Sequence, residues 1–331
     1  MGYRKILGSV AAIASVAMIG SAAEAAQKLS SIACLQSTNL LTKGFIEHFQ
    51  KAAEKVTKGA ISVNYVGANE VVPPRNAYRA VQRGQFDLLH CPTSYYAGAL
   101  PEAWAMLATT LPPAEIRKNG GFALLDKIYQ ERVGAKLLSW ADWATSYHLY
   151  LVPKPKIGKD GLPDLTGMKL RASATYRPLI EALGGSTINM SESEVYTALQ
   201  RGIIQGFGFT DNSVPQLGVS KIIRYRIMPN FYHTNTVVTM NLDKYNSLSQ
   251  AEKDALEAVS LSYEKTLPPY VETNTQKEVA ELHAAGVQDF EVTGEARKKY
   301  LAIAYEALWM FLAEKKSPYQ DELRAKLYRA E

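Results

Sequence analysis

Cysteine and histidine are scarce in this sequence, which has 2 Cys and 5 His among 331 residues. Two thiols exclude a disulfide-rich scaffold and a zinc site built from four thiolates. The histidines are scattered, and none stands at the spacing of metal ligands. The motifs of serine hydrolases, zinc proteases, phosphate-binding loops and dithiol redox sites are also missing. We therefore expect no metal and no cofactor, whereas catalysis is not excluded, because catalytic groups can be assembled from distant segments.

Charge of one sign is not concentrated anywhere. Lys and Arg number 37 and Asp and Glu 32, which gives a formal net charge of +5 spread along the chain. Nucleic-acid binding needs a basic stripe, so we expect no nucleic-acid partner. With 47% hydrophobic residues the composition is globular, and the length is sufficient for two lobes with separate cores.

Only one long apolar run is present, and it lies at the N-terminus. It covers residues 6–19, follows a basic pair and precedes Ala23-Glu24-Ala25, which matches the Ala-x-Ala cleavage pattern. As a helix it would reach about 21 Å, too short for a bilayer core of about 30 Å. We expect residues 1–25 to be a signal peptide cleaved near Ala25, so that the protein is exported. A membrane anchor is the less favoured alternative.

The rest of the chain alternates between strand-like and helix-like segments. Residues 29–90 show the order strand, helix, strand, helix, strand, which is typical of parallel strands in the α/β class. The alternation restarts after residue 140. There, Ser191 and Glu194 form a capping-box pattern that predicts a helix over 192–200. From Ser249 onward the pattern is mostly helical.

Two local features bear on the geometry of this fold. Pro268-Pro269 must kink or break the helical segment in which it lies. Cys34 and Cys91 fall near the ends of predicted strands in the first unit. Two buried thiols are the favoured interpretation, and a disulfide is the alternative, which an oxidising compartment would permit.

Arg171 ends an apolar strand in the run Leu165-Thr166-Gly167-Met168-Lys169-Leu170-Arg171. A guanidinium in that position needs a carboxylate, either from the protein or from a ligand. Its planar fork binds a carboxylate through two parallel hydrogen bonds, which Lys cannot reproduce. Periodicity alone favours a structural ion pair over a ligand site.

This run, together with Glu194-Val195-Tyr196-Thr197-Ala198-Leu199-Gln200, resembles the periplasmic solute-binding subunits of TRAP transporters, the DctP-like family. The similarity is collinear over nearly all of the chain after the signal peptide. It implies a two-lobed α/β periplasmic binding protein fold, with a ligand cleft between the lobes and a long bridging helix. We expect lobe I to comprise residues 26–146 and 235–273, and lobe II residues 147–234 and 274–331.

The resemblance implies that Arg171 grips the carboxylate of a small organic acid. Positions that flank the motifs or end strands are further candidates, because open α/β sheets bind ligands at the carboxyl ends of their strands. These candidate ligand-binding residues are Gln36, Glu70, Tyr95, Trp143, Tyr147, Ser173, Glu192, Phe209, Thr210, Asp211, Phe231 and His233, with Trp140 as a further aromatic candidate.

Departures from the family pattern indicate the ligand class. Gln205 stands where relatives have an Asp, and Ser146-Tyr147-His148 where many have a second Arg. Losing a second cationic grip argues against dicarboxylates and sugar acids, and aromatic walls favour an apolar body. We expect a monomeric carrier of an aromatic or apolar monocarboxylate that serves a TRAP permease in the periplasm. The alternatives are a protein that presents its ligand to a membrane sensor and, less favoured, a secreted enzyme.

Overall fold

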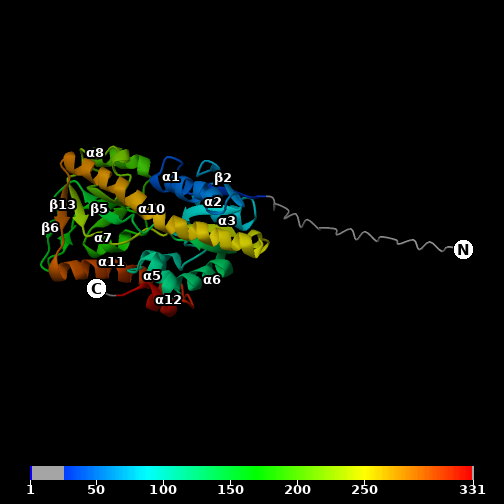
Figure 1. The fold of residues 1–331 in the computed structure, drawn as a ribbon. Helices are drawn as coiled ribbons and strands as arrows, with labels where there is room; N and C mark the ends of the chain where they lie inside the picture. The colour runs from blue at the N-terminus through cyan, green and yellow to red at the C-terminus, as the bar shows by residue number, and fades with distance from the viewer. Residues whose placement is uncertain (2–25, 330–331) are drawn as a thin grey trace.

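The computed structural model describes Met1 and residues 26–329. Apart from Met1, the predicted signal peptide and its cleavage point lie outside the described residues. Among the described helices, none combines the length and apolar character needed to cross a membrane. Figure 1 shows two groups of strands and helices that share one long helix.

Five strands form the first sheet, in the order β2-β1-β3-β12-β4. They are β1 (Gln27–Ala33), β2 (Ile61–Gly67), β3 (Leu88–Pro92), β4 (Ala135–Ser139) and β12 (Thr236–Asn241). β1 runs parallel to β2 and β3, as the alternation of strands and helices predicted, whereas β12 is antiparallel to both of its neighbours. Every residue of β3 is buried, as expected for a strand that is covered on both faces.

Helices cover the faces of this sheet. They are α1 (Leu40–Phe45), η1 (Ile46–Gln50), α2 (Lys51–Val56), α3 (Pro74–Gln82), η2 (Thr93–Tyr96), α4 (Ala103–Leu107), α5 (Pro113–Lys118), α6 (Gly121–Val133) and α9 (Leu242–Asn246). α1, η1 and α2 follow one another without a break, so they form the one helix that was expected between the first two strands. Phe45, Phe49 and Ala53 recur at helical spacing and are fully buried against the sheet and the long helix.

Six strands form the second sheet, in the order β13-β11-β5-β10-β8-β9. They are β5 (Tyr147–Leu151), β8 (Lys169–Arg171), β9 (Ser186–Ile188), β10 (Gly206–Thr210), β11 (Tyr225–Met228) and β13 (Gln288–Glu291). The accompanying elements are the hairpin β6 (Lys156–Ile157) and β7 (Pro163–Asp164), with α7 (Arg177–Ala182), η3 (Glu192–Glu194), α8 (Val195–Gln200) and η4 (Pro215–Leu217). The predicted capping box of Ser191 and Glu194 is present at the start of η3, which leads into α8.

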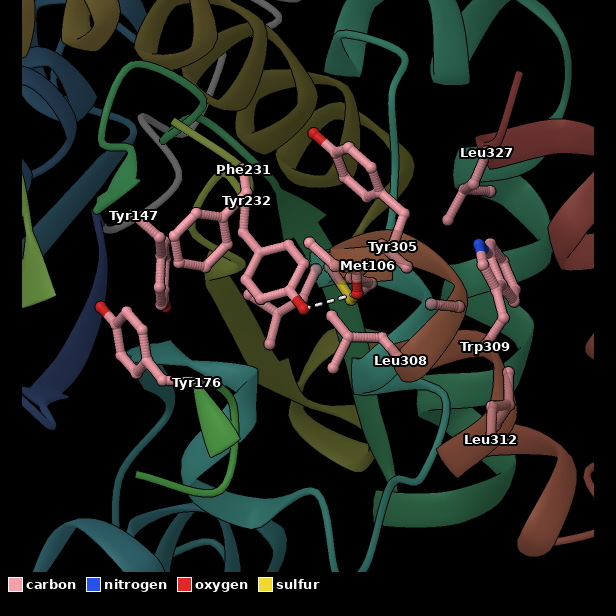
Figure 2. Packing of buried hydrophobic residues seen from close by; sticks show 14 of the residues in the cluster. Met106, Tyr147, Tyr176, Phe231, Tyr232, Tyr305, Leu308, Trp309, Leu312 and Leu327 are labelled. Atoms are coloured by element: carbon pink, nitrogen blue, oxygen red, sulfur yellow. Dashed lines mark hydrogen bonds between the residues drawn. The ribbon is translucent and has the colours of Figure 1, made fainter. Parts of the chain in front are cut away.

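Each sheet with its helices forms one lobe, and of the two C-terminal helices the first touches both lobes whereas the second packs on the first lobe. α11 (Gly294–Glu314) packs on α7 of the second lobe and on α4 of the first, while α12 (Gln320–Leu327) packs on α4 and α6. The exact lobe boundaries given above stay a prediction. The aromatic side chains of α11 continue the buried cluster that begins beneath the second sheet, as Figure 2 shows for Tyr305 and Trp309.

The long helix α10 (Gln250–Ala284) spans both lobes and continues through Pro268 and Pro269. The prolines therefore do not break the helix, and a kink, the other expected effect, stays a prediction. A proline inside a helix costs about 3 kcal/mol, but Leu267 and Val271 on either side are fully buried. Burial of large aliphatic side chains contributes about 1.5–3 kcal/mol each, which offsets the penalty.

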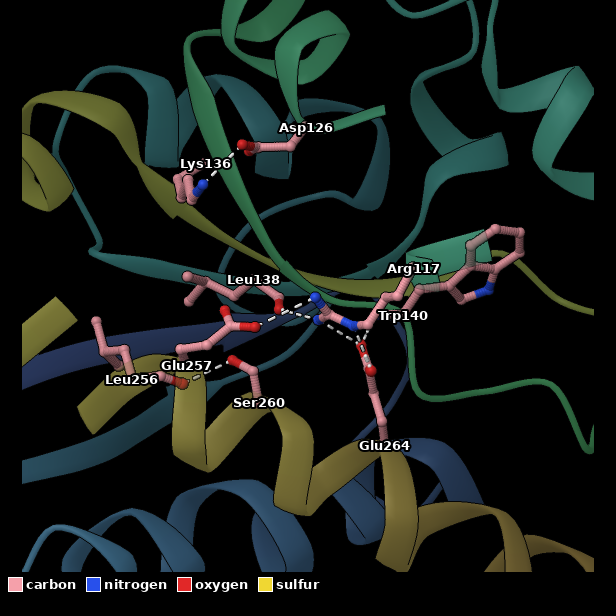
Figure 3. A network of polar contacts seen from close by, with 9 residues as sticks. All are labelled: Arg117, Asp126, Lys136, Leu138, Trp140, Leu256, Glu257, Ser260 and Glu264. Carbon is pink, nitrogen blue, oxygen red and sulfur yellow. Dashed lines mark hydrogen bonds and ion pairs between the residues drawn. The ribbon is translucent and has the colours of Figure 1, made fainter. Parts of the chain in front are cut away.

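A polar network ties α10 to the first lobe just before the prolines (Figure 3). Glu264 accepts hydrogen bonds from Arg117 Nε at 2.6 Å and Nη2 at 2.8 Å, and from the backbone N–H of Trp140 at 2.9 Å. Arg117 Nη2 also donates to the carbonyl of Leu138 at 3.0 Å. The bidentate ion pair is mostly shielded from water, and it fixes the bridging helix to the end of β4.

Cys34 and Cys91 form a disulfide, with their Cα atoms 4.9 Å apart. The favoured expectation of two free thiols is therefore wrong. The cause is the register of two neighbouring parallel strands, in which Ala33 of β1 lies opposite His90 of β3. The next residue of each strand is a cysteine, so the two sulfur atoms are brought together.

Candidate functional site

Arg171 lies at the carboxyl end of β8 and is only 9% exposed. Its Nε donates to the carbonyl of Met190 at 3.2 Å, and Nη1 donates to the carbonyl of Gly208 at 3.3 Å. Its guanidinium carbon lies 5.9 Å from the centre of the Phe209 ring. Both hydrogen-bond acceptors are neutral, and no carboxylate among the described residues forms an ion pair with Arg171. The remaining N–H groups and the full positive charge are therefore available to an anion.

Tyr176, in the loop between β8 and α7, forms one side of the space near Arg171. Its ring packs on Gly208 so closely that a Cβ at that glycine would lie 2.3 Å from a ring carbon. The ring centres of Tyr147 and Phe231 lie 5.3 and 5.8 Å from it (Figure 2). Tyr176 was not among the predicted site residues, although an aromatic residue soon after a strand-end Arg is a signal that points to it.

Phe231 and Trp140 are packed inside the protein in this structure, and their role as walls of a site stays a prediction. Both side chains are fully buried. Phe231 lies behind the rings of Tyr147 and Tyr176 and is in edge contact with Tyr232. Phe231 thereby supports the rings of Tyr147 and Tyr176, because close packing fixes the ring orientations.

Tyr95 reaches the same region from the first lobe, where it lies on η2 directly after β3. Its side chain is 38% exposed, yet partial burial raises the pKa of its phenol. Glu192 raises this pKa further, whereas Arg171 and Arg75 lower it. Glu192 and Arg171 belong to the second lobe, so the phenol of Tyr95 lies within electrostatic reach of charged groups across the gap between the lobes. Arg75, at the start of α3, was not predicted.

The other first-lobe candidates follow strand ends, as predicted. Gln36 is exposed beyond β1, and Glu70 is exposed beyond β2. Glu70 Oε1 accepts hydrogen bonds from the backbone N–H of Ala68 at 2.8 Å and from Ser37 Oγ at 3.4 Å. These bonds, led by the one from Ala68, lower the pKa of Glu70. The carboxylate of Glu70 therefore stabilises the turn in which Glu70 itself lies. The side chain of Gln36 is the less constrained of the two.

Asp211 binds the segment near Ser146 in which the chain crosses from the first lobe to the second, here called the crossing. No hydrogen bond or ion pair joins Asp211 to Arg171. Its Oδ1 accepts from the N–H of Ser146 at 3.1 Å, and its own N–H donates to the carbonyl of Ser146 at 2.8 Å. Burial raises the pKa of Asp211 to about 7, and nearby Asp142 raises it further. The bonds to Ser146 and the charge of Arg226 oppose this shift.

A cavity of about 380 Å³ lies next to Asp211, between the second sheet and α10. His148, Arg226 and Thr275 are among its lining residues, but Arg171 is not. A second cavity of similar volume is lined by residues of α11 and the C-terminal segment, among them Lys298 and Tyr328. Neither of these cavities contains the space around Arg171.

The remaining candidates divide between this crossing and the second lobe. His233 stacks on Trp143 with ring centres 4.0 Å apart, its Nδ1 lies 2.7 Å from the Trp143 carbonyl, and burial lowers its pKa to about 4. Thr210 Oγ1 donates to Asn212 Oδ1 at 3.2 Å. These three predicted residues therefore have structural partners at the crossing.

Ser173 and Glu192 lie on the side of the second lobe that carries Arg171. Ser173 is half-buried two residues beyond β8, and its carbonyl accepts from the N–H of Tyr176 at 3.1 Å. Glu192 is exposed in the first turn of η3. The structure thus gathers Arg171, Tyr95, Tyr147, Tyr176 and Phe209 in one region, with Glu192 and Arg75 as charged neighbours.

Similarity to known proteins is found both in the sequence and in the fold. Residues 32–112 and 117–315 match the model of the family described as bacterial extracellular solute-binding protein, family 7, DctP. A monocarboxylate 2-oxoacid-binding periplasmic protein of Nostoc sp. is 24% identical over 234 residues, which cover 67% of this chain and 62% of that protein. The chain thus spans less than two thirds of that relative's length.

Solved structures show the same fold. A TRAP periplasmic solute-binding protein from Ochrobactrum anthropi has a TM-score of 0.77 at 18% identity, over 91% of this chain and 94% of that one. An extracytoplasmic solute receptor from Bordetella pertussis that binds pyroglutamic acid has a TM-score of 0.72 at 18% identity, over 91% and 99%. The predicted two-lobed fold, with a ligand cleft between the lobes and a long bridging helix, is confirmed.

Proposed function

Because the chain belongs to the DctP family of bacterial extracellular solute-binding proteins, we propose that it captures a small organic acid for a TRAP transporter. It does so in the periplasm, after cleavage near Ala25, as a monomer that delivers the acid to the membrane permease without catalysis. The observation that carries this proposal is Arg171, a buried guanidinium held by two backbone carbonyls with no described carboxylate as its partner.

The first step is docking of the ligand carboxylate on Arg171. The N–H groups that do not bond to Met190 and Gly208 form two parallel hydrogen bonds to the carboxylate oxygens. The rings of Tyr147, Tyr176 and Phe209 then enclose the body of the acid. Since these groups all belong to the second lobe, the acid binds there before the lobes close.

Closure follows when the docked acid also contacts the first lobe. Tyr95 is the first-lobe side chain whose phenol is already under the influence of Arg171. A ligand that touches Tyr95 as well as Arg171 binds the closed form more tightly than the open form, and this difference in affinity drives closure. The permease would then recognise the closed form.

The ligand class that we propose is an aromatic or apolar monocarboxylate. Arg171 is the buried guanidinium of the site, and the groups around it are mainly aromatic. Glu192 adds a negative charge near Tyr95, which opposes a second carboxylate. Arg75 is exposed, so water screens its attraction for an anion. The Nostoc relative, whose name states that it binds monocarboxylate 2-oxoacids, is consistent with a single carboxylate.

A thermal-shift screen of about a hundred organic acids tests this proposal. The protein is first unfolded and refolded to remove any acid carried over from expression. A ligand at a thousand times its Kd adds about 4 kcal/mol to the free energy of unfolding, or about 6 °C in Tm for a chain of this length. We expect such shifts from aromatic and apolar monocarboxylates. A largest shift from a C4 dicarboxylate would refute the ligand class, and no shift from any acid would contradict acid binding.

A further inference from the structure

The disulfide lies directly beneath the first-lobe side of the binding region. Cys34 follows the last residue of β1, and Cys91 is the fourth residue of β3. Both side chains are almost completely buried. The sulfur of Cys34 also lies 3.6 Å from the carbonyl oxygen of Pro74, at the start of α3. The bond therefore joins the ends of two strands and contacts a third element that borders the cleft.

Tyr95 lies four residues beyond Cys91, on the turn η2. One side of this turn is held by Asn235, whose carbonyl accepts from the N–H of Thr93 at 3.1 Å and whose Oδ1 accepts from the N–H of Ser94 at 3.4 Å. The hydroxyl of Tyr95 has no hydrogen-bond partner among the described residues. The place of its ring is therefore set by the backbone of η2, and that backbone leaves β3 one residue after the disulfide.

The disulfide is the covalent link between β1 and the backbone that leads from β3 into η2. Apart from it, the last contact between the two strands is the hydrogen bond from the N–H of Cys34 to the carbonyl of His90, at 3.0 Å. A single hydrogen bond at the end of a sheet opens readily, because its net contribution is small. A covalent link between buried side chains does not open in this way.

We propose that the Cys34–Cys91 disulfide is a positioning device for Tyr95, so that full affinity for the organic acid requires the oxidised protein. This inference rests on the function proposed above, because it assigns a role to a residue of the same site. Without the bond, part of the ordering of η2 is left to the binding step, and this loss of preorganisation weakens binding by roughly three- to tenfold.

The bond forms by exchange with a disulfide-bearing oxidant of the extracytoplasmic compartment. One cysteine thiolate attacks the oxidant's disulfide and forms a mixed disulfide, and the second cysteine thiolate then displaces the oxidant. The two thiol protons of the protein end on the two sulfur atoms of the oxidant, which leaves as a dithiol. The oxidant gains two electrons, which the two cysteine sulfurs lose.

The test compares the wild-type protein with a Cys34→Ala, Cys91→Ala variant, each with and without Tyr95→Ala. Calorimetric titration with benzoate measures affinity. We expect the cysteine variant to bind benzoate roughly three- to tenfold more weakly when Tyr95 is present, and with little change when Tyr95 is absent. A Cys34→Ala, Cys91→Val pair fills the space of the two sulfurs and serves if the alanine pair does not fold.

Two controls separate positioning from general loss of stability. Val259→Ala removes fully buried methyl groups on α10 and should lower Tm with no change in benzoate affinity. Hydrogen–deuterium exchange, measured without ligand, should be faster over residues 92–97 in the cysteine variant and unchanged over β10. The exchange experiment needs no ligand, so it tests the disulfide separately from the proposed function.

Each outcome bears on one claim. Equal benzoate affinity with and without the disulfide overturns the positioning role, as does an equal loss of affinity in the Tyr95→Ala background. If the disulfide-bonded wild-type protein binds no benzoate, hydrogen–deuterium exchange alone decides the role of the disulfide. In that case, unchanged exchange over residues 92–97 overturns the positioning role of the disulfide.

Discussion

Replacing Arg171 by Met removes the group on which the proposed function depends. The side chain keeps a similar length and loses the charge and every N–H donor. In the structure, Nε and Nη1 are occupied by the carbonyls of Met190 and Gly208, so the other N–H groups are the ones that meet the ligand. Because these two acceptors are neutral, the substitution leaves no buried carboxylate without its counter-ion. The ligand-free variant should therefore keep a Tm close to that of the wild type.

The loss of affinity follows from the burial of the guanidinium. Breaking a desolvated, hydrogen-bonded charge pair costs about 2–5 kcal/mol, which corresponds to a roughly 30- to 5000-fold increase in Kd. Arg171→Lys keeps the charge but cannot form two parallel hydrogen bonds in one plane. We expect this variant to lie between the wild type and Arg171→Met.

The assay is calorimetric titration with the best acid from the screen, and Arg226→Met is the matched control. Arg226 is also a buried guanidinium of the second sheet, 7% exposed, but both of its contacting nitrogens donate to Asp289 at 2.8 Å. Its removal should leave the Kd unchanged and lower Tm, because Asp289 loses its partner. An Arg171→Met protein whose Kd stays within threefold of the wild-type value would refute the assignment of Arg171.

Three further predictions concern stability. The pKa of Asp211 is raised to about 7, above its ordinary value of 3.8, so the folded state binds a proton that the unfolded state releases between these pH values. This group therefore stabilises the fold as pH falls from 7 toward 4, and the difference in Tm between wild type and Asp211→Asn should change over that range; a constant difference would contradict the shift. Gly208→Ala places a methyl group against the Tyr176 ring and should cost about 1–3 kcal/mol in urea unfolding and weaken acid binding, whereas unaltered values for both would show that the ring yields freely. Loss of the disulfide, which links residues 57 apart, should cost about 4 kcal/mol, or about 6 °C in Tm, and a decrease below 1 °C would show that the unfolded chain is not restrained by it.

The local patterns of the sequence determined the class of the fold. The buried run of β3 and the capping box of Ser191 and Glu194 each depend on residues within a few positions of one another, so they can be identified without tertiary contacts. The isolation of Arg171 at the end of an apolar strand is equally local. These features were sufficient to predict an α/β protein with a charged group at a strand end.

Only the tertiary structure decided which residues meet. The disulfide depends on the register of β1 and β3, and Tyr176 enters the site because Gly208 lets its ring approach the neighbouring strand. Asp211 directly follows β10 in sequence, yet its carboxylate accepts a hydrogen bond from the backbone of Ser146, 65 residues away in the chain. Register, close approach and burial are properties of pairs of residues far apart in the chain. No periodicity or motif within one segment records them, and that is why the partners of Arg171 had to come from the fold.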